Sequence, residues 1–152
     1  MNNNLIITIG REYGTGGREI GQKLALRLGV PFYDRELITR AAKKTGFDEK
    51  LFEQLDKRAT NSFLYSLTMF GSVGLNGMSL TDQLYLAQSN IIREMAEDSS
   101  CVIVGRCADH VLRDFPNKFD FFIHGSIEDR VKRVQTCGDY VIEGKTPEAA
   151  LE

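Results

Sequence analysis

The chain has 152 residues, with 19 Lys and Arg against 21 Asp and Glu, so its formal net charge is −2 at pH 7 with both His neutral. This balance excludes a polybasic nucleic-acid-binding arm and an acidic tail. With 42% hydrophobic and 26% charged residues, the composition matches a soluble globular protein rather than a disordered or fibrous chain, and one domain over residues 1–152 is expected.

The N-terminus and the cysteines indicate a cytoplasmic protein. Met1–Asn4 is polar and uncharged, and no basic region or cleavage pattern of a secretory signal follows it. The three cysteines are odd in number and unevenly spaced, which favours reduced thiols. They are Cys101, Cys107 and Cys137. A zinc site at Cys107, His110 and His124 is disfavoured because an apolar strand separates the two His.

A strand, a glycine-rich turn and a helix are predicted first. Leu5–Ile9 is short, β-branched and apolar on both faces, which suits a strand buried between two layers of helix. The turn follows at Gly14–Gly17, and Gly29 provides a stop signal for the helix. The inward side chains predicted for this helix recur at helical spacing: Ile20, Leu24 and Leu28.

A short extended segment and several helices are predicted next. Pro31 favours extended backbone in Val30–Tyr33, and Asp34 is placed to cap a helix. Ser79 opens the longest helix. Its predicted inward face consists of Leu80, Leu84, Ala87, Ile91 and Met95.

Between Arg58 and Asp82, residues 59–81 carry no charge. Polar residues and glycines interrupt the apolar run, so a transmembrane helix is excluded. Aromatic and aliphatic side chains recur in it at helical spacing, at Phe63, Leu67 and Phe70. This stripe suits a plain core, a mobile cover or a subunit interface, and the pattern leaves the three open.

Two more strands are predicted in the second half, over Cys101–Val104 and Phe119–Ile123, with a helix over Ala108–Arg113 between them. Ser126 with Asp129 resembles a capping box and opens a helix over 127–135. Thr146 and Pro147 open a last helix. Alternating strands and helices predict a three-layer α/β fold with a parallel sheet flanked by helices, and ligands at the carboxyl ends of the strands.

The glycine-rich turn is the main candidate for a binding site. A turn between a buried strand and a helix N-terminus directs backbone N–H groups at one point, where the helix dipole favours a phosphate. Arg11 and Arg18 flank the turn and could neutralise the phosphate. The alternative is a tight connection that holds no ligand.

Five segments resemble the cytidylate kinase-like family of P-loop proteins. They are Ile7–Ile20, Leu24–Gly29, Val30–Asp34, Val102–Arg106 and Gly125–Arg133. The resemblance implies a P-loop NTPase fold and phosphoryl transfer from ATP, with Mg²⁺, to a nucleoside monophosphate or a similar small acceptor. It also implies an acceptor-side helical insertion at about 34–98.

The glycine loop departs from the standard motif in this comparison. That motif ends in Gly-Lys-Ser/Thr, where the Lys reaches the terminal phosphates and the hydroxyl holds Mg²⁺. On this motif, Arg11 stands at the position of the first glycine, Gly17 at the position of the lysine, and Arg18 at the position of the Ser or Thr hydroxyl. Arg18 could replace the missing charge but could not coordinate Mg²⁺. The expected nucleotide-binding residues are Arg11, Gly14, Thr15, Gly16, Gly17, Arg18 and Glu19.

On the acceptor side, the resemblance places Asp34, Arg40 and Arg106 against the acceptor nucleotide. The alternative for Asp34 and Arg40 is a helix cap and a solvated side chain. Arg106 follows a predicted buried strand by two residues, which carries it to the carboxyl edge of the sheet. Asp109 is a candidate for orienting a metal-bound water or a base, although Cys107 stands where the family usually has Asp.

Arg130 and Arg133 lie three residues apart and share a helix face near the start of the family's lid. Such cations stabilise the charge of a moving phosphoryl group, and the alternative is a solvated helix face. The candidate catalytic residues are Arg18, Arg106, Asp109 and Arg130. In the family a lid and a last strand would follow the helix at Thr146, and both are expected to be missing because the sequence ends at Glu152.

Two rival functions remain open. One is a non-catalytic nucleotide- or anion-binding module, favoured by the absent lysine. The other is a structural domain that forms a homo-oligomer through 59–81. The expected partner is a small nucleotide or phosphate-bearing acceptor rather than a nucleic acid or a membrane, with a homo-oligomer through 59–81 as a further possibility.

Overall fold

The computed structural model describes residues 3–34 and 80–137 of the chain. They form a four-stranded sheet in which every pair is parallel, in the order β2-β3-β1-β4. The strands are β1 (Ile6–Arg11), β2 (Phe32–Tyr33), β3 (Cys101–Val104) and β4 (Lys118–Ile123). The helices are α1 (Gly17–Leu28), α5 (Leu80–Asp98), α6 (Ala108–Val111) and α7 (Ile127–Thr136).

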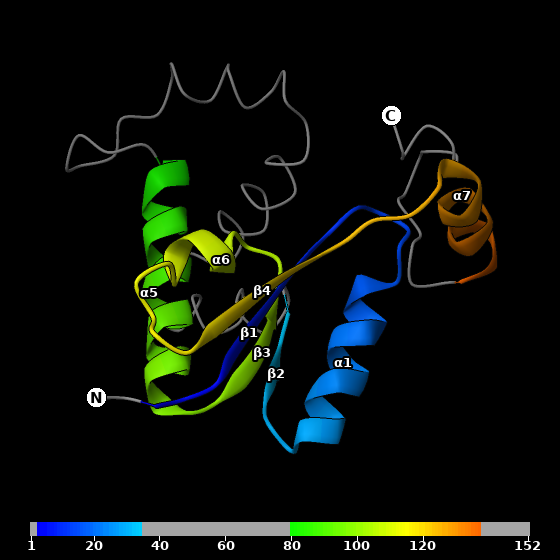
Figure 1. The fold of residues 1–152 in the computed structure, drawn as a ribbon. Helices are drawn as coiled ribbons and strands as arrows, with labels where there is room; N and C mark the ends of the chain where they lie inside the picture. Colours follow the sequence, from blue (N-terminus) through cyan, green and yellow to red (C-terminus); the bar gives the residue numbers. More distant parts are fainter. Residues whose placement is uncertain (1–2, 35–79, 138–152) are drawn as a thin grey trace.

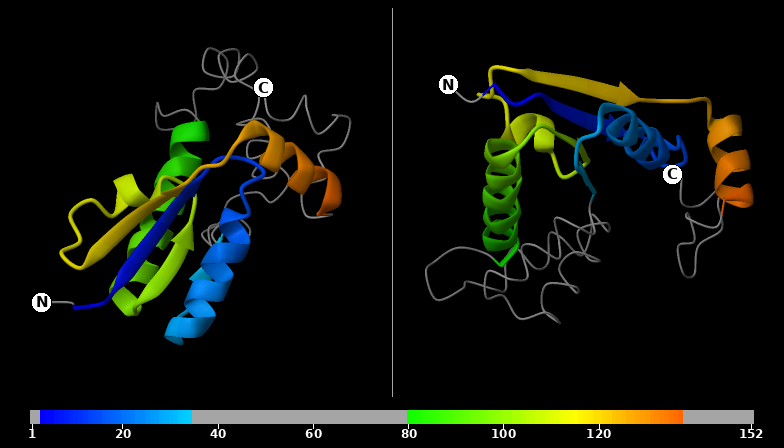
Figure 2. Two further views of the ribbon diagram at one scale, coloured as in Figure 1. Left: turned by 45° about the vertical axis from the view of Figure 1, so that its right-hand side comes forward. Right: turned by 90° about the horizontal axis from the view of Figure 1, so that it is seen from below.

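Helices cover both faces of the two central strands, so β1 and β3 are almost wholly buried. One apolar cluster joins α1 to Ile7, Ile9 and Val102, and a second joins α5 and α6 to alternate residues such as Ile6 and Ile103. Figures 1 and 2 show α1 on one side of the sheet and α5 with α6 on the other. The predicted three-layer α/β fold with a parallel sheet is confirmed.

The predicted inward face of α1 is confirmed at Leu24, which packs against the core, but is wrong at its other two positions. Ile20 is 43% exposed and Leu28 is 44% exposed, whereas the buried residues of this helix include Gly21 and Ala25. A Cβ at Gly21 would lie 2.6 Å from Cγ2 of Val104 on β3. The small residues let the helix approach the sheet closely, and this requirement overrides the hydrophobic pattern.

Helix α5 is confirmed, but its predicted inward face is confirmed only at Met95, which packs against the core; Ala87 and Ile91 are half-buried, and the side chains of Leu80 and Leu84 lie outside the described ones. The fully buried positions that the structure describes are Gln88, Ile92 and Ala96, and Met95 packs beside them as a partly buried neighbour. They recur every four residues, as the buried face of a helix does. Gln88 is polar, so a pattern built on apolar residues passes over it.

The edge strand β4 and the helix after it agree with the sequence prediction. Ser126 caps α7, since its Oγ accepts a hydrogen bond from the Asp129 backbone N–H over 3.2 Å. Helix α6 ends at Val111 rather than at Arg113. No helix among the described residues is long and apolar enough to cross a membrane. Arg40, residues 59–79 and the helix predicted at Thr146 lie outside the described residues.

Candidate functional site

The glycine loop lies at the carboxyl end of β1, between the ends of its neighbours β3 and β4. The connection from β1 leads to β2 at one edge of the sheet, and the connection from β3 leads to β4 at the other edge. Open α/β sheets bind ligands at such a reversal, which here lies between β1 and β3. Gly14 and Gly16 adopt left-handed backbone with φ of +83° and +76°, which glycine adopts without a steric penalty. Gly16 is the N-cap of α1, so the N-terminus of that helix opens at the loop.

The loop is fastened to the segment that joins β4 to α7. The Glu12 backbone N–H donates to the carbonyl oxygen of Ile123 over 3.0 Å, and the Gly125 N–H donates to Glu12 Oε2 over 3.2 Å. Within the loop, Thr15 Oγ1 donates to the Glu12 carbonyl over 2.8 Å. These bonds fix the loop backbone before any ligand arrives.

Arg130 holds the same loop from α7. Its Nε donates to the carbonyl oxygen of Tyr13 over 2.7 Å, and its Nη1 lies 3.4 Å from Glu12 Oε2. The Arg130 side chain is only 13% exposed. In Figure 1, α7 lies beyond the end of β4, beside the loop. Arg130 therefore acts on the loop as a clamp, which is a role that the sequence did not suggest.

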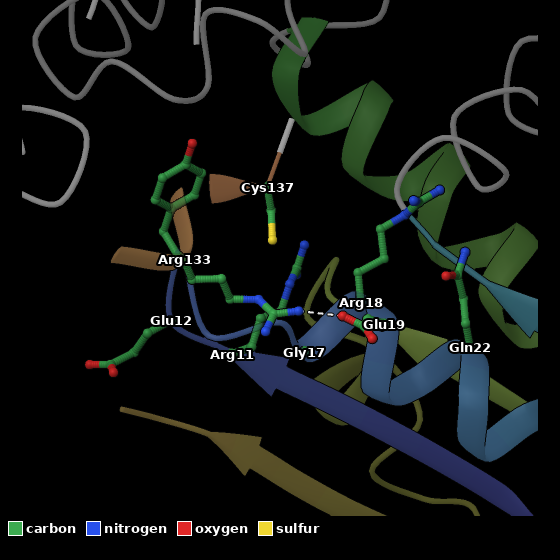
Figure 3. Close-up of a pocket in the computed structure, with 10 residues that line it drawn as sticks. Arg11, Glu12, Gly17, Arg18, Glu19, Gln22, Arg133 and Cys137 are labelled. Carbon is green, nitrogen blue, oxygen red and sulfur yellow. Dashed lines mark hydrogen bonds and ion pairs between the residues drawn. The ribbon is translucent and has the colours of Figure 1, made fainter. Parts of the chain in front are cut away.

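A cavity of about 460 Å³ opens over the loop (Figure 3). Five of the predicted nucleotide-binding residues line it: Arg11, Gly14, Gly17, Arg18 and Glu19. Five further lining residues are Glu12, Tyr13, Gln22, Arg133 and Cys137. Gln22 shares a helix face with Arg18 and could have been included on that ground. Arg133 comes from α7 and Cys137 directly follows this helix, so both are far away in the sequence.

Most of the charges around the cavity are paired with one another. Arg18 Nε lies 2.8 Å from Asp34 Oδ2 at the end of β2, and Arg133 forms an ion pair with Glu19. Lys23 Nζ donates to Glu19 over 2.6 Å. The Lys23 hydrogen bond and charge, followed by those of Arg133, lower the pKa of Glu19. Glu19 is therefore a carboxylate at neutral pH, and two cations balance its charge.

Gly105, Arg106 and Cys107, which follow β3, all have positive φ, at +79°, +60° and +51°. Arg106 and Cys107 are not glycine, so positive φ strains their backbone. Strained residues of this kind cluster at functional sites. Arg106 is half-buried at the carboxyl edge, as predicted, but it does not line the cavity. Asp109 also stays apart, on the exposed side of α6, where its carbonyl accepts a hydrogen bond from Lys118 Nζ over 3.0 Å.

Comparison with known proteins identifies the family. The model of the cytidylate kinase-like family matches residues 6–149. The chain belongs to the cytidylate kinase-like family.

A search among solved structures finds a similar chain. The crystal structure of an uncharacterized protein from Eubacterium ventriosum ATCC 27560 is 31% identical, with a TM-score of 0.63. The match covers 97% of this chain and 67% of that chain. Among curated proteins there is no match. Family membership makes this chain a kinase-like, nucleotide-binding protein.

The glycine loop fits the phosphates of a nucleotide. A Cβ at Gly14 would lie 3.0 Å from the carbonyl oxygen of Arg130, so the cradle depends on the absence of side chains. The loop leads into the N-terminus of α1, where backbone N–H groups and the helix dipole favour an anion. Arg11 and Arg18 add positive charge to the wall of the cavity.

The described residues around the cavity do not provide a set of ligands for Mg²⁺. Arg18 stands where the standard loop has its magnesium-binding hydroxyl. The carboxylates that line the cavity, Glu12 and Glu19, are held by Arg130 and Arg133. In the parts of the chain that the structure describes, no three His, Cys, Asp or Glu side chains gather as a metal site. We therefore derive no step through the metal.

Proposed function

We propose that this protein binds ATP with its phosphates over the glycine loop and transfers the γ-phosphoryl group to a nucleoside monophosphate or a similar small acceptor. The observation that carries the proposal is the loop itself. Gly14, in left-handed backbone, and Gly17, the first residue of α1, line a cavity of about 460 Å³ together with three arginines, Arg11, Arg18 and Arg133. Such a site binds an anion through its backbone and neutralises it through arginine.

The sheet supports an acceptor site beside the loop. Asp34 directly follows β2 and Arg106 follows β3 by two residues, so both lie at the edge where β1 delivers the glycine loop. Arg106 would hold the acceptor's phosphate. Asp34, which is 5% exposed, would act through Arg18. Arg40 belongs to the same proposed acceptor site and lies outside the described residues.

The proposed reaction needs no covalent chemistry from the protein. A phosphate oxygen of the acceptor attacks the γ-phosphorus of ATP, the bond from that phosphorus to the β–γ bridging oxygen breaks, and ADP leaves. The protein positions the two nucleotides and stabilises the negative charge that spreads over the transferred oxygens. The family implies Mg²⁺ for this reaction in general. We also propose a cytoplasmic location and small-molecule partners.

One observation favours a second candidate, a module that binds nucleotide without turning it over. Gly17 stands at the position of the catalytic lysine, and Arg18, at the hydroxyl position, is tied to Asp34. Both side chains that the standard loop devotes to transfer are therefore replaced, whereas the backbone cradle is kept.

A coupled assay of ADP release separates the two candidates. The full chain is incubated with ATP, Mg²⁺ and each of CMP, dCMP, UMP, AMP and GMP, and ATP binding is measured in parallel by calorimetry. The transfer proposal expects one acceptor to raise turnover well above the acceptor-free rate, and Arg106→Ala to raise the KM for that acceptor. Arg113→Ala, which removes an exposed arginine just after α6, is the control and should change neither. ATP binding without stimulation by any acceptor would overturn transfer in favour of the binding module.

A further inference from the structure

The loop has Gly17 where the standard motif has its lysine. The side chain of another basic residue, Arg11, passes the position that the Cβ of this lysine would occupy. We propose that Arg11, the last residue of β1, supplies the phosphate-binding charge that the standard loop takes from its lysine. This inference rests on the proposed function, because it assigns the cation that binds the triphosphate. Arg11 is exposed and lines the cavity, as Figure 3 shows.

The first argument is the contact between Arg11 and Gly17. A Cβ at Gly17 would lie 2.8 Å from Cβ, 2.9 Å from Cγ and 3.5 Å from Cδ of Arg11. Real Cβ atoms do not approach other atoms as closely as the two shorter distances, and neither partner atom is the free end of a flexible chain. The stem of Arg11 and a side chain at position 17 therefore exclude each other. Arginine at 11 and glycine at 17 form a matched pair.

The second argument is where the guanidinium ends. A Cβ at Gly105 would lie 2.2 Å from Arg11 Nη1 and 3.3 Å from its Cζ, so the side chain crosses from the end of β1 to the turn after β3. Gly105 has a φ of +79°, which also favours glycine at this place. The absence of side chains at Gly17 and Gly105 therefore leaves the space that the Arg11 side chain occupies. Its charge is delivered to the carboxyl edge, between the glycine loop and Arg106.

The third argument comes from the other arginines of the site. Arg18 holds Asp34, Arg133 holds Glu19, and Arg130 holds Glu12 and the Tyr13 carbonyl. Each of them therefore balances a carboxylate of the protein. In Figure 3, Arg133 is directed at Glu19, whereas Arg11 rises from the strand end beside Gly17. Because its stem lies over Gly17, where the standard loop has its lysine, Arg11 takes the role that the sequence suggested for Arg18. Its planar fork can bind two phosphate oxygens at once.

The test moves the positive charge from position 11 to position 17. Arg11→Met keeps part of the stem and removes the charge, and Arg11→Gly removes the side chain. Gly17→Lys places a lysine against the Arg11 stem, and the double variant Arg11→Gly/Gly17→Lys rebuilds the standard order. ATP and inorganic triphosphate binding are measured by calorimetry on the full chain. Thermal unfolding reports the folding of each variant, and Arg113→Ala is the control for loss of a surface arginine.

We expect Arg11→Met and Arg11→Gly to weaken binding of both ligands about tenfold or more, since charge-assisted hydrogen bonds to phosphate are lost. Gly17→Lys alone should weaken binding and lower the Tm, and the double variant should recover most of both losses. A folded Arg11→Met protein that binds ATP like the native one would overturn the inference and leave the proposed function standing. A double variant no better than Gly17→Lys would overturn it as well. Failure of the native protein to bind ATP would overturn both.

Discussion

Arg18 Nε donates a hydrogen bond to Asp34 Oδ2 over 2.8 Å, and this ion pair joins the first turn of α1 to the residue after β2. Asp34 is buried, whereas the Arg18 side chain is 44% exposed. The pair fixes the helix that carries the glycine loop relative to the strand that leads to the proposed acceptor site.

We expect Arg18→Ala to lower the free energy of unfolding by about 1 kcal/mol, because it removes the charged partner of a buried carboxylate while solvent screens part of the interaction. Lys23→Ala is the control, since its ion pair with Glu19 is exposed on both sides and should contribute little. Urea denaturation measures both variants. Equal effects of the two substitutions would mean that the Arg18–Asp34 pair does not stabilise the fold.

Gly14 and Gly29 provide a matched test of how α7 packs on the loop. Both have positive φ, at +83° and +66°, so alanine at either position costs about 1–2 kcal/mol in backbone strain. A Cβ at Gly14 would also lie 3.0 Å from the Arg130 carbonyl oxygen, whereas a Cβ at Gly29 would meet nothing within 4 Å. Gly14→Ala should therefore lower the Tm more than Gly29→Ala and should also weaken ATP binding. Equal Tm losses would contradict the packing of α7 against the loop.

Gly21 tests how closely α1 approaches the sheet. Alanine is favoured over glycine in a helix by about 1 kcal/mol, so Gly21→Ala would stabilise an exposed helix. Here the new Cβ would lie 2.6 Å from Val104 Cγ2 and 3.0 Å from Phe32 Cε2. We expect a net loss of about 1–2 kcal/mol in urea denaturation, because overpacking outweighs propensity. A stabilised Gly21→Ala protein would show that α1 lies farther from β3.

Cys101 and Cys107 should differ in their reactivity toward thiol reagents. Cys101 is buried in β3 and Cys107 is exposed. In the native protein at pH 8, a thiol reagent should modify Cys107 rapidly and Cys101 only after unfolding. Burial raises the pKa of Cys101 from 9.0 to about 11. The folded state therefore holds this proton more tightly, and the resulting stability is complete below about pH 9 and is lost as the pH rises toward 11.

Urea denaturation at several pH values between 8 and 11 checks this titration. Cys101→Ala should lower stability at pH 8 and should show a shallower decline across the alkaline range. An unchanged decline would mean that another group causes it.

The elements and the loop could be predicted because local signals fix them. The glycines at 14, 16 and 29 stand where the structure has positive φ, and Ser126 caps the helix that it was expected to cap. The run Cys101–Val104 is buried throughout, as an apolar strand between two helical layers should be. Family membership follows from the same segments.

The orientation of the helices and the pairing of the arginines could not be predicted. Gly21 faces the sheet because it is small, and Gln88 faces it although it is polar, so a search for large apolar residues misses both. Arg130 was placed near a lid but binds the Tyr13 carbonyl, a backbone acceptor with no signature in the sequence. The passage of Arg11 over Gly17 depends on a distance between strand end and helix start that only the folded chain sets.

A crystal structure of the full chain with a non-hydrolysable ATP analogue would place the triphosphate directly. We predict that the β- and γ-phosphates lie against the backbone of Gly14–Gly17, with the Arg11 guanidinium within hydrogen-bonding distance of their oxygens. An analogue bound elsewhere on the protein, or a cavity over the loop that stays empty at saturating concentrations of the analogue, would contradict nucleotide binding at this site.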